Sequence, residues 1–235
     1  MNEAQRDPGP GTKIGVVTIG QAPRADVVPH MVSAWGEGVT VVEIGALDGL
    51  SHAGIARLAP DDNSDLLVTR MVDGCEVVVS HRLVTPRMQM AVNDLVEQGC
   101  DPIVVLCTGV FELESPGPRL VYPRKVLEHL AVTMGLATPG VTLGLLVPDP
   151  KQEEPMADRW RKLTSRVIAS SASPYEFNEG PAAFERAGEK LYKGDARVIV
   201  MDCMGYTPAM RRALQQRAPV PVVLANQAVA YAAKP

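Results

Sequence analysis

Short runs of apolar residues alternate with longer stretches of mixed apolar and polar residues along almost the whole chain. The short runs are rich in Val, Ile and Leu, which is typical of strands that are buried on both faces. The mixed stretches have helical composition and often end near Gly or Pro. This alternation predicts an α/β protein in which parallel sheets are covered by helices and the crossover connections are right-handed.

Eight strands are predicted, four in each half of the chain. They span residues 13–20, 39–45, 76–80 and 103–106 in the first half and 141–147, 166–170, 198–201 and 221–224 in the second. The predicted helices span residues 27–35, 85–97, 123–134, 156–163, 181–192, 208–214 and 226–233. Residues 47–59 are ambiguous between a loop and a short helix, and the acidic residues in 61–65 indicate the start of another helix.

The two halves resemble each other weakly. Each begins with a similar strand, IGVVTIG at 14–20 and VTLGLLV at 141–147, and each reaches a cysteine at a later strand end. This repetition predicts two pseudo-symmetric Rossmann-like lobes, each with a four-stranded parallel sheet, facing each other across an inter-lobe cleft. Pro, Gly and Ser between residues 112 and 123 mark the junction.

We therefore expect a disordered leader at 1–12, a first lobe at 13–112 and a second lobe at 113–224. The C-terminal helix at 225–235 is expected to complete the first lobe.

Composition narrows the classes of partner. The 235 residues are 46% hydrophobic, which is enough for a packed core, and the net charge is only −4 with no basic run. Neither a nucleic acid nor an anionic membrane is therefore suggested as a partner. No apolar run approaches the roughly 20 residues that cross a bilayer, and the N-terminus is too polar for a signal peptide. We expect a cytoplasmic protein.

The four cysteines show no CxxC or CxxH spacing, which argues against structural zinc. We expect no metal and no cofactor, and in a reducing cytoplasm free thiols are the default. Cys75 and Cys100 are interpreted as small apolar residues beside strands.

Cys107 and Cys203 differ from the other two cysteines. Each follows a buried strand and precedes a turn, Thr108-Gly109 in one half and Met204-Gly205 in the other. Such turns direct backbone N–H groups at the carboxyl edge of the sheet, where open α/β folds bind their ligands. This setting is expected to lower the thiol pKa and to bind a carboxylate.

Two opposed thiols suit proton transfer without a cofactor at a carbon next to a carboxylate. One thiolate removes a proton from one face of that carbon, and the opposite thiol delivers a proton to the other face. The sequence therefore predicts Cys107 and Cys203 as catalytic residues and a small-molecule carboxylate as the substrate.

Other polar residues lie near predicted strand ends. Arg24 is interpreted either as a clamp on the substrate carboxylate or as the partner of Asp26 on the surface, and Arg82 has the same two interpretations. Thr108 and Thr207 either bind substrate or cap turns, with capping favoured for Thr207. The remaining candidates for substrate binding are Gln21, Gly109, Gln152, Met204 and Gly205.

Several familiar sites are excluded. The first loop, Gly20 to Arg24, lacks the GxGxxG of dinucleotide-binding folds, and no GxxxxGK[ST] or GxSxG is present. Neither Cys107 nor Cys203 has an arginine six residues later, so a phosphatase-type phosphate loop does not fit. The four histidines have no metal spacing, and only His81 lies near a strand end.

Four segments together resemble the AroM family, and more distantly the aspartate/glutamate/hydantoin racemase superfamily. They are TIGQAPRAD at 18–26, LLVTRMVDG at 66–74, VVLCTG at 104–109 and VIVMDCMGYT at 198–207. The resemblance covers most of the chain from Lys13 onward. It implies two pseudo-symmetric α/β lobes with the active site between them, the two cysteines of the superfamily at Cys107 and Cys203, and a homodimer.

Two departures from the superfamily pattern concern the substrate. Asp202 and Met204 replace the usual neighbours of the second cysteine, and the first loop reads Gln-Ala-Pro-Arg in place of an Asp-Ser-Gly type sequence. The leading hypothesis is a cofactor-independent racemase or isomerase of a small carboxylate. Its alternatives are a cysteine-dependent decarboxylase or cis–trans isomerase on the same fold, and a non-catalytic protein that binds a small carboxylate.

Overall fold

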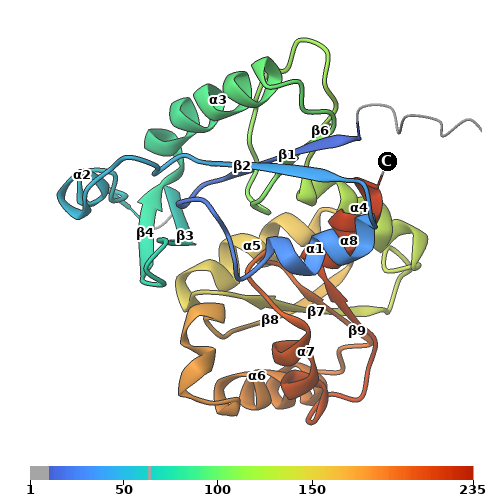
Figure 1. The fold of residues 1–235 in the computed structure, drawn as a ribbon. Helices are drawn as coiled ribbons and strands as arrows, with labels where there is room; N and C mark the ends of the chain where they lie inside the picture. The colour runs from blue at the N-terminus through green and yellow to red at the C-terminus, as the bar shows by residue number, and fades with distance from the viewer. Residues whose placement is uncertain (1–10, 63–64, 235) are drawn as a thin grey trace, which may run out of the picture.

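A computed structural model describes residues 11–62 and 65–234 of the chain. Most of the expected leader, residues 1–10, lies outside the described residues. Two parallel sheets lie one above the other in Figure 1, and helices occupy the layer between them as well as their outer faces.

The first sheet has the strand order β2-β1-β5-β6, and all its pairs are parallel. Its members are β1 (Lys13–Thr18), β2 (Thr40–Gly45), β5 (Ile103–Val105) and β6 (Leu120–Val121). The register places Val16 of β1 between Glu43 of β2 and Val104 of β5.

The second sheet repeats this arrangement in the order β10-β9-β7-β8, again with parallel pairs. Its members are β7 (Thr142–Val147), β8 (Arg166–Ser171), β9 (Val198–Met201) and β10 (Val222–Leu224). Numbered within its own half, each sheet reads 2-1-3-4, so the predicted fold of two related lobes with four-stranded parallel sheets is confirmed.

One strand of the first half was predicted wrongly. β4 (Glu76–Ser80) does not join the parallel sheet but pairs antiparallel with β3 (Leu66–Arg70), and β6 supplies the fourth strand instead. Gly74 takes φ +92° in the turn between β3 and β4, and β4 buries only its last two residues, so it lacks the two covered faces of a central strand.

The same hairpin overturns the helix expected after residues 61–65, because the described chain after this point is β3. Residues 63–64 lie outside the described residues. Helix α3 (His81–Glu97) begins at the end of β4, four residues before the predicted start, since the Ser80 hydroxyl accepts from the Leu83 N–H and caps it.

The other helices are close to their predicted ranges. They are α1 (Val28–Trp35), α2 (His52–Ala56), α4 (Pro123–Thr133), α5 (Glu153–Arg161), α6 (Ala182–Lys193), α7 (Pro208–Gln215) and α8 (Ala225–Ala232), with short 3₁₀ turns η2 (Pro150–Gln152) and η3 (Pro174–Glu179). No helix in the described part of the chain is both long and apolar enough to cross a membrane.

The alternation of side chains along each strand divides the apolar residues into three clusters. Ile14 and Val16 of β1 face the layer between the sheets, whereas Val17 faces α3 on the outer side. Likewise Leu145 of β7 faces the central layer, and Leu146 faces α6 and α7. Both sheets therefore share one central hydrophobic cluster.

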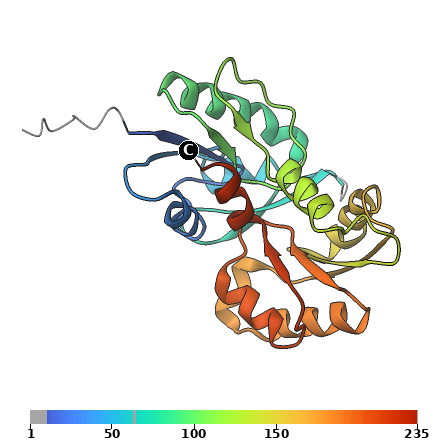
Figure 2. The same cartoon turned by 90° about the vertical axis from the view of Figure 1, so that its right-hand side faces the viewer.

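Helix α8 is the main link in this central layer. It packs against α1 and α4, and Figure 2 shows this last helix between the two sheets. The Trp35 indole N–H of α1 donates to the Ala230 carbonyl of α8 at 2.9 Å. The division of the chain at residue 112 stays a prediction; the first sheet takes β6 from beyond that point.

Replacing Val229 with alanine should destabilise the fold, because its side chain is 0% exposed in the central cluster. Removing two buried methyl groups should lower the free energy of unfolding by about 2 kcal/mol. The matched control, Val132→Ala, makes the same change on α4 at a side chain that is 56% exposed, and should stay within about 0.5 kcal/mol of wild type. Urea denaturation measures both. Equal losses in the two variants would contradict the shared core.

Candidate functional site

A single cavity opens at the carboxyl ends of β5 and β9, one strand from each sheet. The cavity is lined by Cys107, Thr108 and Gly109 after β5 and by Cys203, Met204 and Gly205 after β9. Strand β3 and helix α5 supply further parts of the wall. Its volume is about 170 Å³, and since a cavity of about 150 Å³ in another protein takes up benzene, a small molecule fits here.

The two thiols occupy equivalent positions in the two lobes. Each lies two residues beyond its strand, and each is only partly exposed. The Gly109 N–H donates to the Cys107 sulfur at 3.3 Å, and the Gly205 N–H donates to the Cys203 sulfur at 3.4 Å. The expected pseudo-symmetry therefore extends to the hydrogen bond that each sulfur accepts.

A direct bond between the lobes holds the two turns together. The Thr108 hydroxyl donates to the Asp202 carbonyl at 3.1 Å, so the residue after one cysteine is tied to the residue before the other. Thr108 is buried but still lines the cavity. Thr207 has the capping role favoured for it, because its hydroxyl accepts from the Met210 N–H at the start of α7.

The expected lowering of the thiol pKa values is wrong. Burial raises the pKa of Cys107 to about 11 and that of Cys203 to about 12, from an ordinary 9.0. The backbone N–H bonds and the charge of Arg24 lower both pKa values, but the negative charge of Asp202 raises them. Partial desolvation outweighs the N–H groups, and both thiols are protonated at neutral pH.

Asp202 is a buried acid directly beside the second thiol. One carboxylate oxygen accepts from the Trp160 indole at 2.7 Å and lies 3.7 Å from the Arg124 guanidinium, while the other has no hydrogen-bond partner among the described residues. Burial raises the pKa of Asp202, and the contacts with Trp160 and Arg124 oppose that rise. Arg124 also stacks on the Trp160 ring at 4.6 Å and pairs with Glu128.

Arg24 lines the cavity, yet it is already paired. Two guanidinium nitrogens donate to the two oxygens of Asp26, both at 2.8 Å, which is the second of the two interpretations offered for this residue. The pair is inside the protein and not on its surface, since Arg24 is buried. Its guanidinium also donates to Thr18 at 3.2 Å and to the Tyr175 hydroxyl at 3.3 Å.

Two predicted binding residues lie away from the cavity. Gln21 uses both ends of its amide to join loops: its oxygen accepts from the Val72 N–H at 3.0 Å and its nitrogen donates to the Leu47 carbonyl at 3.4 Å. Arg82 is exposed and pairs with Asp61 at 3.3 Å. Neither residue lines the cavity, so the structure does not place either of them in the candidate site.

Gln152 does line the cavity, as predicted. Its amide nitrogen donates to the Leu66 carbonyl at 3.4 Å, and its buried oxygen has no hydrogen-bond partner in the described part of the chain. Of the other two cysteines, both interpreted as small apolar residues beside strands, Cys100 is buried and Cys75 is exposed, and neither lines the cavity.

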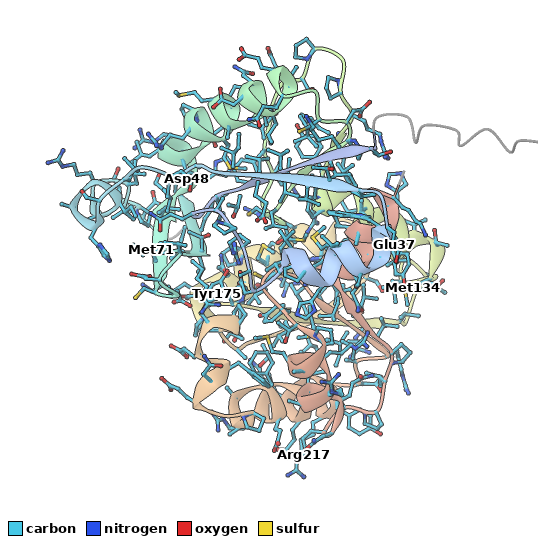
Figure 3. The ribbon with its side chains drawn as sticks, viewed as in Figure 1. Glu37, Asp48, Met71, Met134, Tyr175 and Arg217 are labelled. Atoms are coloured by element: carbon cyan, nitrogen blue, oxygen red, sulfur yellow. The ribbon has the colours of Figure 1, made fainter. Side chains whose placement is uncertain are left out.

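Sequence reasoning missed Arg159, Tyr175 and the position of Asp202 in the cavity wall. Tyr175 lies where the two lobes meet, as Figure 3 shows. The signal for it was the carboxyl end of β8, because η3, which carries Tyr175, begins three residues after that strand. A signal for Arg159 was present: it is three residues after Met156, so both lie on one face of α5.

Within residues 11–62 and 65–234, no cluster of three or more His, Cys, Asp or Glu side chains is arranged to hold a metal ion.

Comparison with known proteins adds three findings. The AroM protein family matches residues 14–234. A search of the curated proteins by sequence found no match. Several solved structures have a similar fold at low sequence identity.

Three of these structures illustrate the likeness. Allantoin racemase from Pseudomonas fluorescens is 18% identical with a TM-score of 0.57, and the match covers 94% of this chain and 89% of that one. Glutamate racemase from Aquifex pyrophilus is 13% identical with a TM-score of 0.57, covering 94% and 82%. Arylmalonate decarboxylase is 13% identical with a TM-score of 0.57, covering 94% and 90%.

Alkylation of Cys107 and Cys203 by iodoacetamide should be slow at pH 7 and should accelerate about tenfold per pH unit up to pH 10, because only the thiolate reacts. Mass spectrometry of the two cysteine peptides gives each rate separately. A plateau of either rate below pH 9 would show that the thiol ionises far more readily than its burial implies.

Asp202→Asn should make both thiols react faster at pH 8, since it removes a negative charge that raises both pKa values while leaving an oxygen for Trp160. Asp158→Asn, an exposed change on α5, is the control and should leave both rates as they are. Slower alkylation in Asp202→Asn than in wild type would contradict this electrostatic account.

Proposed function

The chain belongs to the AroM family, and we propose that it is a cofactor-independent racemase or isomerase of a small carboxylate with Cys107 and Cys203 as its acid and base. The observation that carries the proposal is the pair of equivalent thiols, one from each lobe, on the wall of one small cavity. The racemase folds of the structural neighbours are consistent with it.

The proposed reaction moves one proton in and one proton out. One cysteine, as thiolate, removes the proton from the carbon next to the carboxylate, and the electron pair of that C–H bond passes into the carboxylate as an enediolate. The other cysteine then gives its proton to the opposite face of the same carbon. The configuration is inverted, and the two thiols have exchanged their protonation states.

Backbone groups beside the thiols are suited to hold the acid group. The N–H groups of Thr108 and Met204 have no hydrogen-bond partner among the described residues, and both residues line the cavity. Such N–H groups stabilise the negative charge that gathers on the carboxylate when the proton leaves. Arg24 adds positive charge to the cavity wall, but most of its hydrogen-bond donors are used by Asp26 and are not free to bind the acid group.

The protonated state of both thiols favours one alternative reaction, a decarboxylation. There, the electrons of a C–C bond pass to the carbon as carbon dioxide leaves, and a single thiol supplies the proton that completes the product. This needs a thiol and no thiolate, which the raised pKa values provide. A decarboxylase is also among the proteins of similar fold.

The two reactions predict different pH dependence of the rate. Racemisation needs one thiolate, so its rate should rise from pH 7 toward pH 10, as the thiols begin to ionise. A decarboxylase that uses one thiol as an acid should keep its rate over the same range and lose it only above pH 10.

Deuterium incorporation tests the proposal directly. The protein is incubated in deuterated water with a panel of amino, hydroxy and aryl acids and with malonates, and loss of the α-proton signal is followed by NMR. Wild type should exchange at least one acid, and Cys107→Ser and Cys203→Ser should each lower the rate by about 10²-fold or more. Cys75→Ser changes an exposed thiol outside the cavity and should exchange at the wild-type rate.

Exchange that survives in both serine variants would remove the thiols from the mechanism. Absence of exchange and of carbon dioxide release over the whole panel, together with measurable binding of one of the acids, would favour a non-catalytic carboxylate-binding protein.

A further inference from the structure

Four of the ionisable side chains that line the cavity are already bonded to other groups of the protein. Arg24 is matched by Asp26, and Asp202 lies beside Arg124. Asp65 caps the start of α3, where it accepts from the Ser80 hydroxyl and the Arg82 N–H, and His81 bonds to the Val110 carbonyl. These groups leave little charge for a ligand.

Arg159 is the exception. It lines the cavity and is half-buried, and no carboxylate in the described part of the chain lies within 4.0 Å of its guanidinium. The one hydrogen bond that its guanidinium makes within the described residues is weak, from a guanidinium nitrogen to the Met156 sulfur at 3.5 Å. A partly desolvated guanidinium with free donors binds a carboxylate strongly, often through two parallel hydrogen bonds.

A second arginine on α5, Arg161, contrasts with Arg159 because it is paired with carboxylates. Arg161, two positions later, lies outside and pairs with Glu154 at 2.6 Å and with Asp158 at 2.5 Å. Arg159 instead shares the cavity face of α5 with Met156 and lines the same cavity as the two thiols.

We propose that Arg159 binds the carboxylate of the ligand and so sets its orientation, with the acid group toward α5. This inference rests on the proposed function for the class of ligand, a small carboxylate, and adds to it the residue that recognises the acid group. The location is supported by electrostatics: burial dominates the pKa of Cys107, but Arg159 is one of two arginines whose charge lowers it.

Two reagents of nearly equal size test the proposal without knowledge of the natural ligand. Iodoacetate carries a carboxylate and iodoacetamide is neutral, and with both the sulfur displaces iodide while the thiol proton passes to solvent. The measured quantity is the ratio of their rate constants at Cys107 at pH 9, obtained by mass spectrometry. A change in thiol pKa affects both reagents alike, so this ratio isolates recognition of the carboxylate.

In wild type the ratio of iodoacetate to iodoacetamide rates should exceed that of free cysteine, and Arg159→Gln should lower it by about tenfold. Arg159→Lys keeps the charge but not the paired donors and should fall between the two. Arg161→Gln removes an arginine from the outer side of the same helix and should keep the wild-type ratio. Far-UV circular dichroism confirms that each variant is folded.

A wild-type ratio no higher than that of free cysteine, or one that is unchanged in Arg159→Gln, would overturn the assignment. The deuterium experiment fails or succeeds independently. Exchange without any effect on the ratio would keep the proton-transfer proposal and reject Arg159, whereas an altered ratio without exchange would keep the carboxylate site and reject the chemistry.

Discussion

The central hydrophobic layer is the constraint on which the rest of the structure depends. Residues such as Val16 and Leu145 point inward from the two sheets onto the same helices, and α8 fills the space between them with Val229 fully buried. Because the layer is common to both halves, the sheets cannot pack independently. The ends of β5 and β9 are therefore held at one cavity, and the Thr108 to Asp202 bond closes the remaining gap.

The electrostatics of this cavity follow from its burial. Two thiols, two carboxyl groups, two guanidinium groups and an imidazole line this small volume. Unpaired buried charges are costly, and here Arg24 is paired with Asp26 while Asp202 is surrounded by Trp160 and Arg124. The thiols themselves receive only one backbone N–H each, so they stay protonated. A site of this kind holds its thiol protons at neutral pH and releases them only as the pH rises toward the raised pKa values of the two cysteines.

The sequence pattern was sufficient to predict the two lobes and most of their strands, because strands buried on both faces, such as β7 and β9, are largely apolar along their length. It failed at β4, whose three valines look the same although the strand lies in a two-stranded hairpin, and at β6, which is only two residues long. It placed the two cysteines at strand ends, but the strength of desolvation around them depends on distant segments such as η3, and no local pattern carries that information. Arg82 and Gln21 stood at the expected strand ends and were still outside the cavity, since the direction of a side chain after a strand is set by the contacts it finds.

The most direct test of the central claim is whether one small bifunctional reagent joins the two thiols. 1,3-Dibromoacetone has a reactive carbon on each side of one carbonyl, and it is applied to the protein at pH 9 with Cys75 and Cys100 replaced by serine. If both sulfurs face one cavity of this size, the peptides that contain Cys107 and Cys203 should be recovered joined by a single three-carbon bridge. Recovery of the two peptides only as separate adducts, at any ratio of reagent to protein, would contradict the account.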